Sequence, residues 1–190
     1  NHTSGTQEGF PTPSAMVADN DLALGRIAEA ISKSKFWSET VIFVIEDDPQ
    51  NGLDHVDGHR TVAFCISPYT KRQKVVSTHY NQNSILRSIQ LIFGLPPMTQ
   101  FDLFALPMND CFTDVPDFTA YEHLPNNVPL DEMNPRLADI SGEQLNWAKK
   151  SMALNLSLND DLNVEEEITL NKVLWYSVKG YDRPYPELNK

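Results

Sequence analysis

The sequence carries little positive charge and no long apolar run. Its 190 residues include 15 basic and 26 acidic ones, which gives a net charge of −11. Nucleic-acid backbones need a cationic face, so this balance argues against nucleic acid as a partner. No apolar stretch approaches the ~20 residues that a membrane span requires. There is no initiator Met and no signal-like segment, so we expect any targeting signal to lie outside this chain.

Several well-known catalytic motifs are missing as well. The chain has no CxxC, no GxGxxG, no P-loop, no GxSxG and no internal repeat. Its two cysteines, Cys65 and Cys111, are far apart in the sequence, and their number fixes neither a pairing nor a compartment. What is present is a 41% hydrophobic fraction, which is enough for a real core in one domain.

Hydrophobic periodicity predicts four helices separated by polar, Pro-rich stretches. Asp19 or Asn20 is the expected N-cap of the first helix, and Ser141 with Gln144 forms the capping-box pattern of the third. The second helix should stop at Gly94, before two prolines. The expected helices cover 20–34, 81–94, a segment opening at 141 and 165–179, with a loop at 1–18 and an irregular segment at 95–140. Helical spacing puts the apolar residues of two of these helices on one face, namely Ile85, Ile89 and Ile92 in 81–94, and Leu170, Val173, Leu174 and Val178 in 165–179. The first turn of the last helix is acidic, which suits the positive end of the helix dipole.

Two short apolar runs, Thr40–Ile45 and Thr61–Ser67, read as strands. The first is an unbroken run of β-branched and aromatic residues, typical of a strand covered on both faces, as in a parallel sheet, and the second reads as another buried strand. The order of helix, strand, strand and helix favours an α/β layered fold.

The residues between these strands are rich in metal-ligand types. Seven of the fourteen residues from Glu46 to His59 are carboxylates or imidazoles, namely Glu46, Asp47, Asp48, Asp54, His55, Asp57 and His59. Carboxylates alone would suit Ca²⁺ or Mg²⁺, and added imidazoles shift the preference toward Zn²⁺, Mn²⁺ or Fe. The same run contains ordinary turn sequences, so a solvated surface loop is the alternative interpretation.

The residues around this run resemble a known family. The stretch Trp37–Asp48, followed by Asp54-His55-Val56 and Asp57–Thr61, is similar to the phosphoesterase family of the alkaline phosphatase superfamily, which includes bacterial phospholipase C-type enzymes and acid phosphatases. Ser67-Pro68-Tyr69 and Gly94-Leu95-Pro96-Pro97 match it too. The resemblance implies part of an alkaline phosphatase-like α/β/α sandwich with a largely helical and irregular C-terminal extension. Residues 1–112 would belong to the phosphoesterase domain, and 113–190 would be the extension packing on it.

The resemblance also implies a site with two divalent metals (Zn, Mn, Ca or Mg) and a phosphate-ester substrate. Asp47 and Asp48 would ligate one metal, and His59 with His2 would be the natural set for the second. Asp54 and His55 match the family's Asp-His motif, either as ligands or as hydrogen-bonding support for ligands. Arg60 would face a substrate phosphate or form a structural ion pair.

Two departures from the family's pattern shape the expected function. Asn1 stands where the subgroup usually has Asp, and the family's Ser or Thr nucleophile would lie upstream of Asn1. We therefore expect a C-terminal half that supplies metal ligands to a phosphomonoesterase or phosphodiesterase and lacks the nucleophile. The missing N-terminal half of the same protein would be its partner, and the fragment alone would be inactive. The intact enzyme would act through a covalent phosphoenzyme.

The family resemblance implies a periplasmic or secreted location.

Other functions fit the same residues. A non-catalytic module with a structural Ca²⁺-binding acidic loop is the main alternative, and a sulfate or phosphonate ester could replace the phosphate ester.

Overall fold

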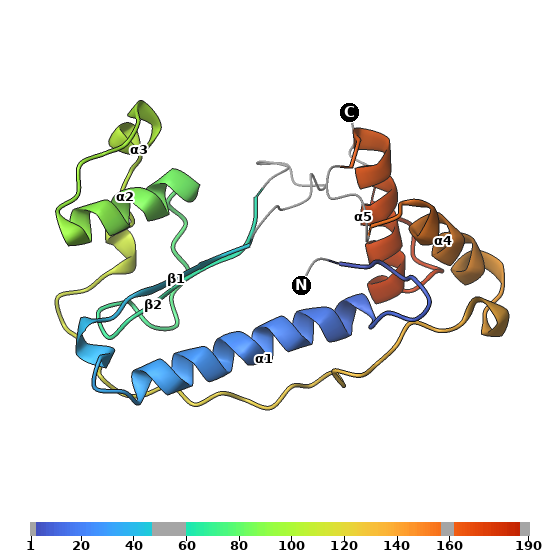
Figure 1. Ribbon diagram of the computed structural model, residues 1–190, viewed down its shortest axis with the longest axis horizontal. Coiled ribbons are helices and arrows are strands. Elements are labelled where there is room, and N and C mark those ends of the chain that lie inside the picture. Colours follow the sequence, from blue (N-terminus) through green and yellow to red (C-terminus); the bar gives the residue numbers. More distant parts are fainter. Residues whose placement is uncertain (1–2, 47–59, 157–161, 187–190) are drawn as a thin grey trace. The chain divides into compact units, whose positions relative to one another are not determined.

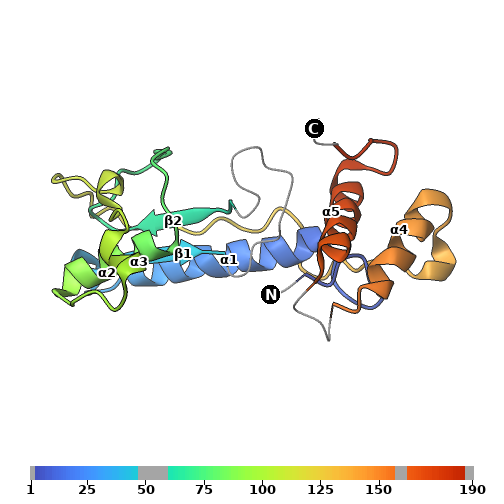
Figure 2. The same cartoon turned by 90° about the horizontal axis from the view of Figure 1, so that it is seen from above.

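The computed structural model describes residues 3–46, 60–156 and 162–186 (Figures 1 and 2). The chain divides into two compact units, which are formed by the described residues of two sets of segments. The first set is Asn1–Ile27, Asp48–Arg60 and Glu122–Lys190, and the second is Ala28–Asp47 and Thr61–Tyr121. The helices and strands together confirm the mixed α/β class expected from the sequence. Among the described helices, none has the length and apolar content needed to cross a bilayer.

The first helix, α1, spans Pro13–Ser32 and begins earlier than the sequence predicted. The Thr12 hydroxyl accepts a hydrogen bond from the backbone N–H of Ala15 at 3.1 Å, as an N-cap does. Pro13 occupies the first helical position, where its fixed φ is favourable and its missing N–H costs nothing. The predicted N-cap at Asp19 or Asn20 was therefore wrong, because the Pro-rich stretch opens the helix.

In the first unit, two helices pack against each other, α4 (Gly142–Ala153) and α5 (Val164–Lys179). Both views show them side by side (Figures 1 and 2). Leu170 and Val173 of α5 are buried, as their helical spacing predicted, whereas Val178 of the same predicted face is 58% exposed. The rings of Trp147 and Tyr176 join the two helices, with centroids 4.8 Å apart.

The two helices begin differently. The Asn163 side chain caps α5 by accepting from the N–H groups of Glu165 and Glu166, and the Glu166 carboxylate accepts from the N–H of Asn163 in return. Ser141 makes no such side-chain bond at the start of α4, so the predicted capping box was wrong. Gly142 has φ +58, a left-handed conformation that removes the regular first turn on which a capping box depends.

The second unit contains the two strands, β1 (Ile42–Ile45) and β2 (Ala63–Ile66). They pair antiparallel, so the expected parallel arrangement was wrong. Neither strand is fully covered, because Phe64 of β2 remains 50% exposed and Ile45 of β1 remains 38% exposed. The 3₁₀ turn Trp37–Glu39 precedes β1, and Trp37 is buried edge-on against Tyr121 at 6.0 Å.

Two helices of the second unit, α2 (Gln82–Phe93) and α3 (Gln100–Phe104), contact each other. Gly94 ends α2 with φ 65, as the sequence predicted, and Asn81 caps its start, a role that the sequence analysis did not assign. The buried side chains of α2 are polar ones, Ser84, Ser88 and Gln90, whereas Ile92 of the predicted apolar face is 53% exposed. Helix α3 interrupts the segment that was predicted to be irregular.

Asp102 of α3 is buried, with 1% of its surface exposed, and joins α3 to α2. Its carboxylate accepts hydrogen bonds from the Thr99 hydroxyl, from Gln90 Nε2 at 2.6 Å and from the backbone N–H groups of Met98 and Thr99, each at 2.7 Å. These bonds, first that from Thr99 and then that from Gln90, hold the pKa of Asp102 well below its usual range. The ionised carboxylate is therefore the form that organises this turn.

We expect Leu170→Ala to lower the free energy of unfolding by about 2–5 kcal/mol, because the cavity left at this buried position loses both transfer and packing energy. Ile168→Ala on the same helix is the control. Ile168 is 46% exposed, so its truncation should cost less than about 1 kcal/mol. Denaturant titration of both variants measures the difference, and equal losses would contradict the packing described for α4 and α5.

Asp102 should make the folded protein less stable as the pH falls. Its folded-state pKa lies below its unfolded-state value of about 4, so its contribution is present above that pH and is lost as the pH falls through the folded-state pKa. Asp102→Asn should therefore lower the melting temperature at pH 7, and the gap from the native protein should shrink as the pH approaches 3. Asp114→Asn, at an exposed position, is the control and should show no such gap.

Candidate functional site

The acidic run predicted to bind metal is the connection of a β-hairpin. The register of β1 and β2 pairs Ile42 with Ile66 and Ile45 with Ala63, so the run leaves one strand and enters the other at the same end of the pair. Glu46 follows β1 directly, and its carboxylate accepts a hydrogen bond from the hydroxyl of Thr61, just before β2. The two ends of the run are therefore held together by strand pairing and by this side-chain bond.

The opposite end of the hairpin is fixed by buried hydroxyls. Ser67, 1% exposed, donates from its hydroxyl to the Thr40 carbonyl at 2.9 Å, which ties the exit of β2 to the entry of β1. Thr70 donates to the Ser67 carbonyl at 2.8 Å and accepts from the Ser67 N–H at 3.2 Å. The Ser67-Pro68-Tyr69 motif thus clamps the strand pair. Sequence reasoning recognised the motif but did not predict this role.

One cysteine lies within the hairpin and the other next to a residue that packs on it, and both are protonated thiols. Cys65 lies on β2, paired in register with Phe43, whose ring meets Phe112 edge-on at 6.4 Å next to Cys111. Burial, with a smaller contribution from Cys111, raises the pKa of Cys65 to about 12, and burial also raises the pKa of Cys111. Both thiols are free. A thiol with a raised pKa is a poor nucleophile, so neither is a candidate for the attacking group.

Of the predicted site residues, only Arg60 lies in the described part of the chain, where it is exposed. The predicted metal ligands Asp47, Asp48, Asp54, His55, His59 and His2 lie outside the described residues. Within residues 3–46, 60–156 and 162–186, no group of three or more His, Cys, Asp or Glu side chains could hold a metal ion. The ligand set and the role of Arg60 stay predictions.

The chemistry of the donor set still fits a divalent metal. Two adjacent carboxylates, Asp47 and Asp48, follow the strand end that Glu46 marks, and two imidazoles follow within the same connection. Mixed carboxylate and imidazole ligands suit Zn²⁺ or Mn²⁺ better than Ca²⁺. Glu46 was counted among the ligand types in the sequence. Its bond to Thr61 shows that it also closes the base of the hairpin.

Comparison with known proteins places this hairpin within a family. The model of the Phosphoesterase family matches residues 6–96, a segment that contains α1, both strands, the acidic run and α2. No curated protein matches the chain. The match confirms the family that the sequence resembled.

Proposed function

We propose that this chain, whose residues 6–96 belong to the Phosphoesterase family, contributes the metal-binding hairpin of an enzyme that hydrolyses phosphoric esters. The family match carries the proposal, because it covers the acidic run together with the two strands that frame it. The antiparallel register supports it, since both ends of the candidate ligand run are held at one end of the strand pair. Phosphoester hydrolysis is the activity that the family indicates.

In the proposed site, Asp47 and Asp48 hold one divalent metal, and His59 with His2 holds a second, with Asp54 and His55 as further ligands or supports. Zn²⁺ or Mn²⁺ fits the mixed donor set best. Bound metals would lower the pKa of an attacking hydroxyl and stabilise negative charge on the phosphoryl oxygens. Arg60 follows His59 directly and would bind a substrate phosphate oxygen through its guanidinium.

The nucleophile in this proposal is a Ser or Thr supplied by another part of the protein. Its oxygen would form a bond to phosphorus as the bond to the alcohol leaving group breaks, and water would then hydrolyse the phosphoenzyme. The hydroxyls of Thr3 and Thr12 are engaged locally, accepting from the backbone N–H groups of Gly5 and Ala15 at 3.1 Å each. That engagement favours structural roles for both. An exported, periplasmic or secreted, location is part of the same proposal.

The exposed apolar surface of α2 and α3 supports a completing partner. Nine large apolar side chains between residues 91 and 106 are 45–80% exposed. Asp102, the one charged side chain of this stretch, is buried. Soluble proteins rarely expose apolar surface of this extent unless it is a contact surface. We propose that the part carrying the nucleophile covers it, together with the exposed face of β2 around Phe64.

Removing the two proposed carboxylate ligands should remove the metal ion that they hold. We expect Asp47→Ala combined with Asp48→Ala to lose a bound metal ion, because the remaining imidazoles cannot replace two carboxylates. Elemental analysis after chelation and reloading with Zn²⁺ or Mn²⁺ measures it. Glu165→Ala with Glu167→Ala, which removes two carboxylates from α5, is the matched control and should keep the native metal content.

Unchanged metal content in the Asp47 and Asp48 variant would refute the ligand assignment. Thermal stabilisation by Ca²⁺ but not by Zn²⁺ or Mn²⁺ would favour the structural calcium loop instead.

The 190-residue chain alone should not turn over a phosphate ester. We expect p-nitrophenyl phosphate and bis-p-nitrophenyl phosphate to be hydrolysed at the buffer rate in the presence of Zn²⁺ or Mn²⁺, because the attacking group is absent. Robust metal-dependent turnover by this chain would contradict the missing-nucleophile proposal, while leaving the metal assignment to the elemental analysis.

A further inference from the structure

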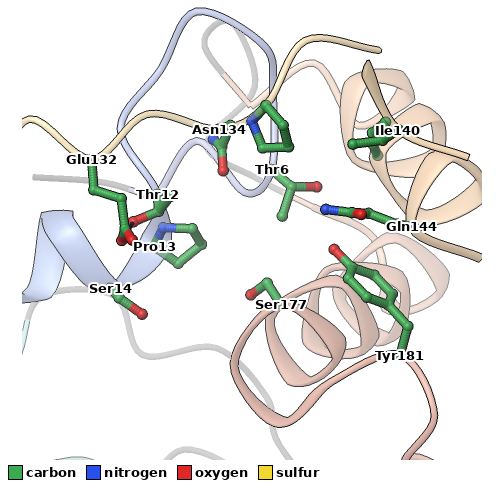
Figure 3. Close-up of a pocket in the computed structure, with 12 residues that line it drawn as sticks. Thr6, Thr12, Pro13, Ser14, Glu132, Asn134, Ile140, Gln144, Ser177 and Tyr181 are labelled. Carbon is green, nitrogen blue, oxygen red and sulfur yellow. Dashed lines mark hydrogen bonds between the residues drawn. The ribbon is translucent and has the colours of Figure 1, made fainter. Parts of the chain in front are cut away.

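The first unit contains a cavity of about 250 Å³ that no step of the proposed reaction uses. Its walls come from the loop before α1, from residues 132–135, and from α4, α5 and the turn after α5. Figure 3 shows the hydroxyls of Thr6 and Tyr181 and the side-chain amide of Gln144 pointing toward one another from three separate segments. From this convergence we propose that the cavity binds a small neutral polyol, with Thr6 and Tyr181 as hydrogen-bonding contacts.

Thr6 is the observation that points to a ligand. Its residue is 7% exposed, and its hydroxyl is buried without a hydrogen-bond partner in the described part of the chain. Buried hydroxyls are normally paired, and leaving one unpaired costs free energy comparable to a lost hydrogen bond. A ligand hydroxyl in the cavity would satisfy this group, because one hydroxyl can both donate to and accept from another.

The loop carrying Thr6 is held rigidly. The Thr6 N–H donates to the Ser151 hydroxyl at 2.9 Å, and Asn134 Nδ2 donates to the carbonyls of Gly5, Gln7 and Pro11 at 2.9–3.3 Å. Gly5 has φ +56, and a Cβ there would lie 2.3 Å from the Ser151 oxygen, so only glycine fits. These bonds hold the backbone around Thr6 and do not use its hydroxyl. The hydroxyl is therefore positioned in advance for a ligand, which lowers the entropic cost of binding.

The charge of the lining selects a neutral ligand. Among the described residues no Lys, Arg or His lines the cavity, so an anion such as phosphate would find no counter-charge there. Of the described lining residues only Glu132 carries a carboxylate, and it already accepts from the Thr12 hydroxyl at 2.8 Å. Burial raises the pKa of Tyr181, so its hydroxyl stays protonated and able to donate at neutral pH.

The size of the cavity and its many polar side chains favour a polyol over a more apolar ligand. A cavity of about 250 Å³ has room for a small polyol, from a triol up to a single sugar ring. Hydroxyls of Ser14 and Ser177 add further polar contacts, while Pro13 and Ile140 provide apolar surface for the C–H groups between them. This inference is independent of the phosphoesterase reaction and of any metal.

The test is a titration of the ¹⁵N-labelled 190-residue chain with glycerol, myo-inositol and glucose, followed by amide chemical shifts, with inorganic phosphate as the anionic comparison. We expect saturable shifts at Thr6, Gln144 and Tyr181 with at least one polyol and none with phosphate. Thr6→Val and Tyr181→Phe should each weaken binding about tenfold, equivalent to about 1.4 kcal/mol for a lost hydrogen bond.

Matched controls separate the cavity from the rest of the unit. Tyr185→Phe and Thr169→Val remove the same groups outside the cavity lining and should leave the affinity native. If Thr6→Val does not fold, comparing the polyol affinity of Tyr181→Phe with that of Tyr185→Phe still tests the proposal. Linear shifts without saturation would mean a water-filled cavity only and would overturn the proposal. Native affinity in Tyr181→Phe, or tighter binding of phosphate than of any polyol, would overturn it as well.

Discussion

The antiparallel register of β1 and β2 is the constraint on which the candidate site depends. Pairing Ile45 with Ala63 brings Glu46 within reach of the Thr61 hydroxyl, and the Ser67 hydroxyl fixes the opposite end of the pair on the Thr40 carbonyl. A two-stranded hairpin is marginal by itself in water, and these side-chain bonds add stability at both of its ends. The family match spans the whole of this frame.

In both units, buried polar side chains also fix the conformation of loops through hydrogen bonds. Asp102 gathers two backbone N–H groups, a hydroxyl and an amide at the α2–α3 turn, and Asn134 gathers three carbonyls of the loop before α1. Each fixes the conformation of a loop next to a helix, α3 in one case and α1 in the other. Because a buried polar group is costly when unpaired, such networks specify one loop conformation.

The sequence predicted α2 and α5 almost to the residue, because Asn81, Gly94 and the acidic first turn of α5 act locally. It misplaced the start of α1, since Pro13 signals both a loop and a first helical turn. It also assigned the wrong strand pairing, because an apolar run such as Ile42–Ile45 does not encode its partner's direction. The types and spacing of the residues around the candidate site predicted a family that the match confirms. The hydrogen bonds of Asp102 and of Ser67 could not be predicted, because they depend on tertiary contacts that no local pattern encodes.

The distribution of apolar surface links the fold to the proposed function. Helix α2 buries the polar side chains Ser84, Ser88 and Gln90 within its own unit and leaves Ile92 and Phe93 exposed. In most globular domains the apolar side chains are the buried ones. Each buried polar side chain is costly unless it is paired, and here Ser88 donates to the Ser84 carbonyl and Gln90 donates to Asp102, so the inner face is satisfied. On the outer face, by contrast, burying the exposed apolar side chains would lower the free energy. At roughly 25 cal/mol per Å² of apolar surface, covering it would stabilise a complex strongly. The proposal that another part of the protein supplies the nucleophile and covers this face would explain why one chain carries both candidate metal ligands and an uncovered apolar surface.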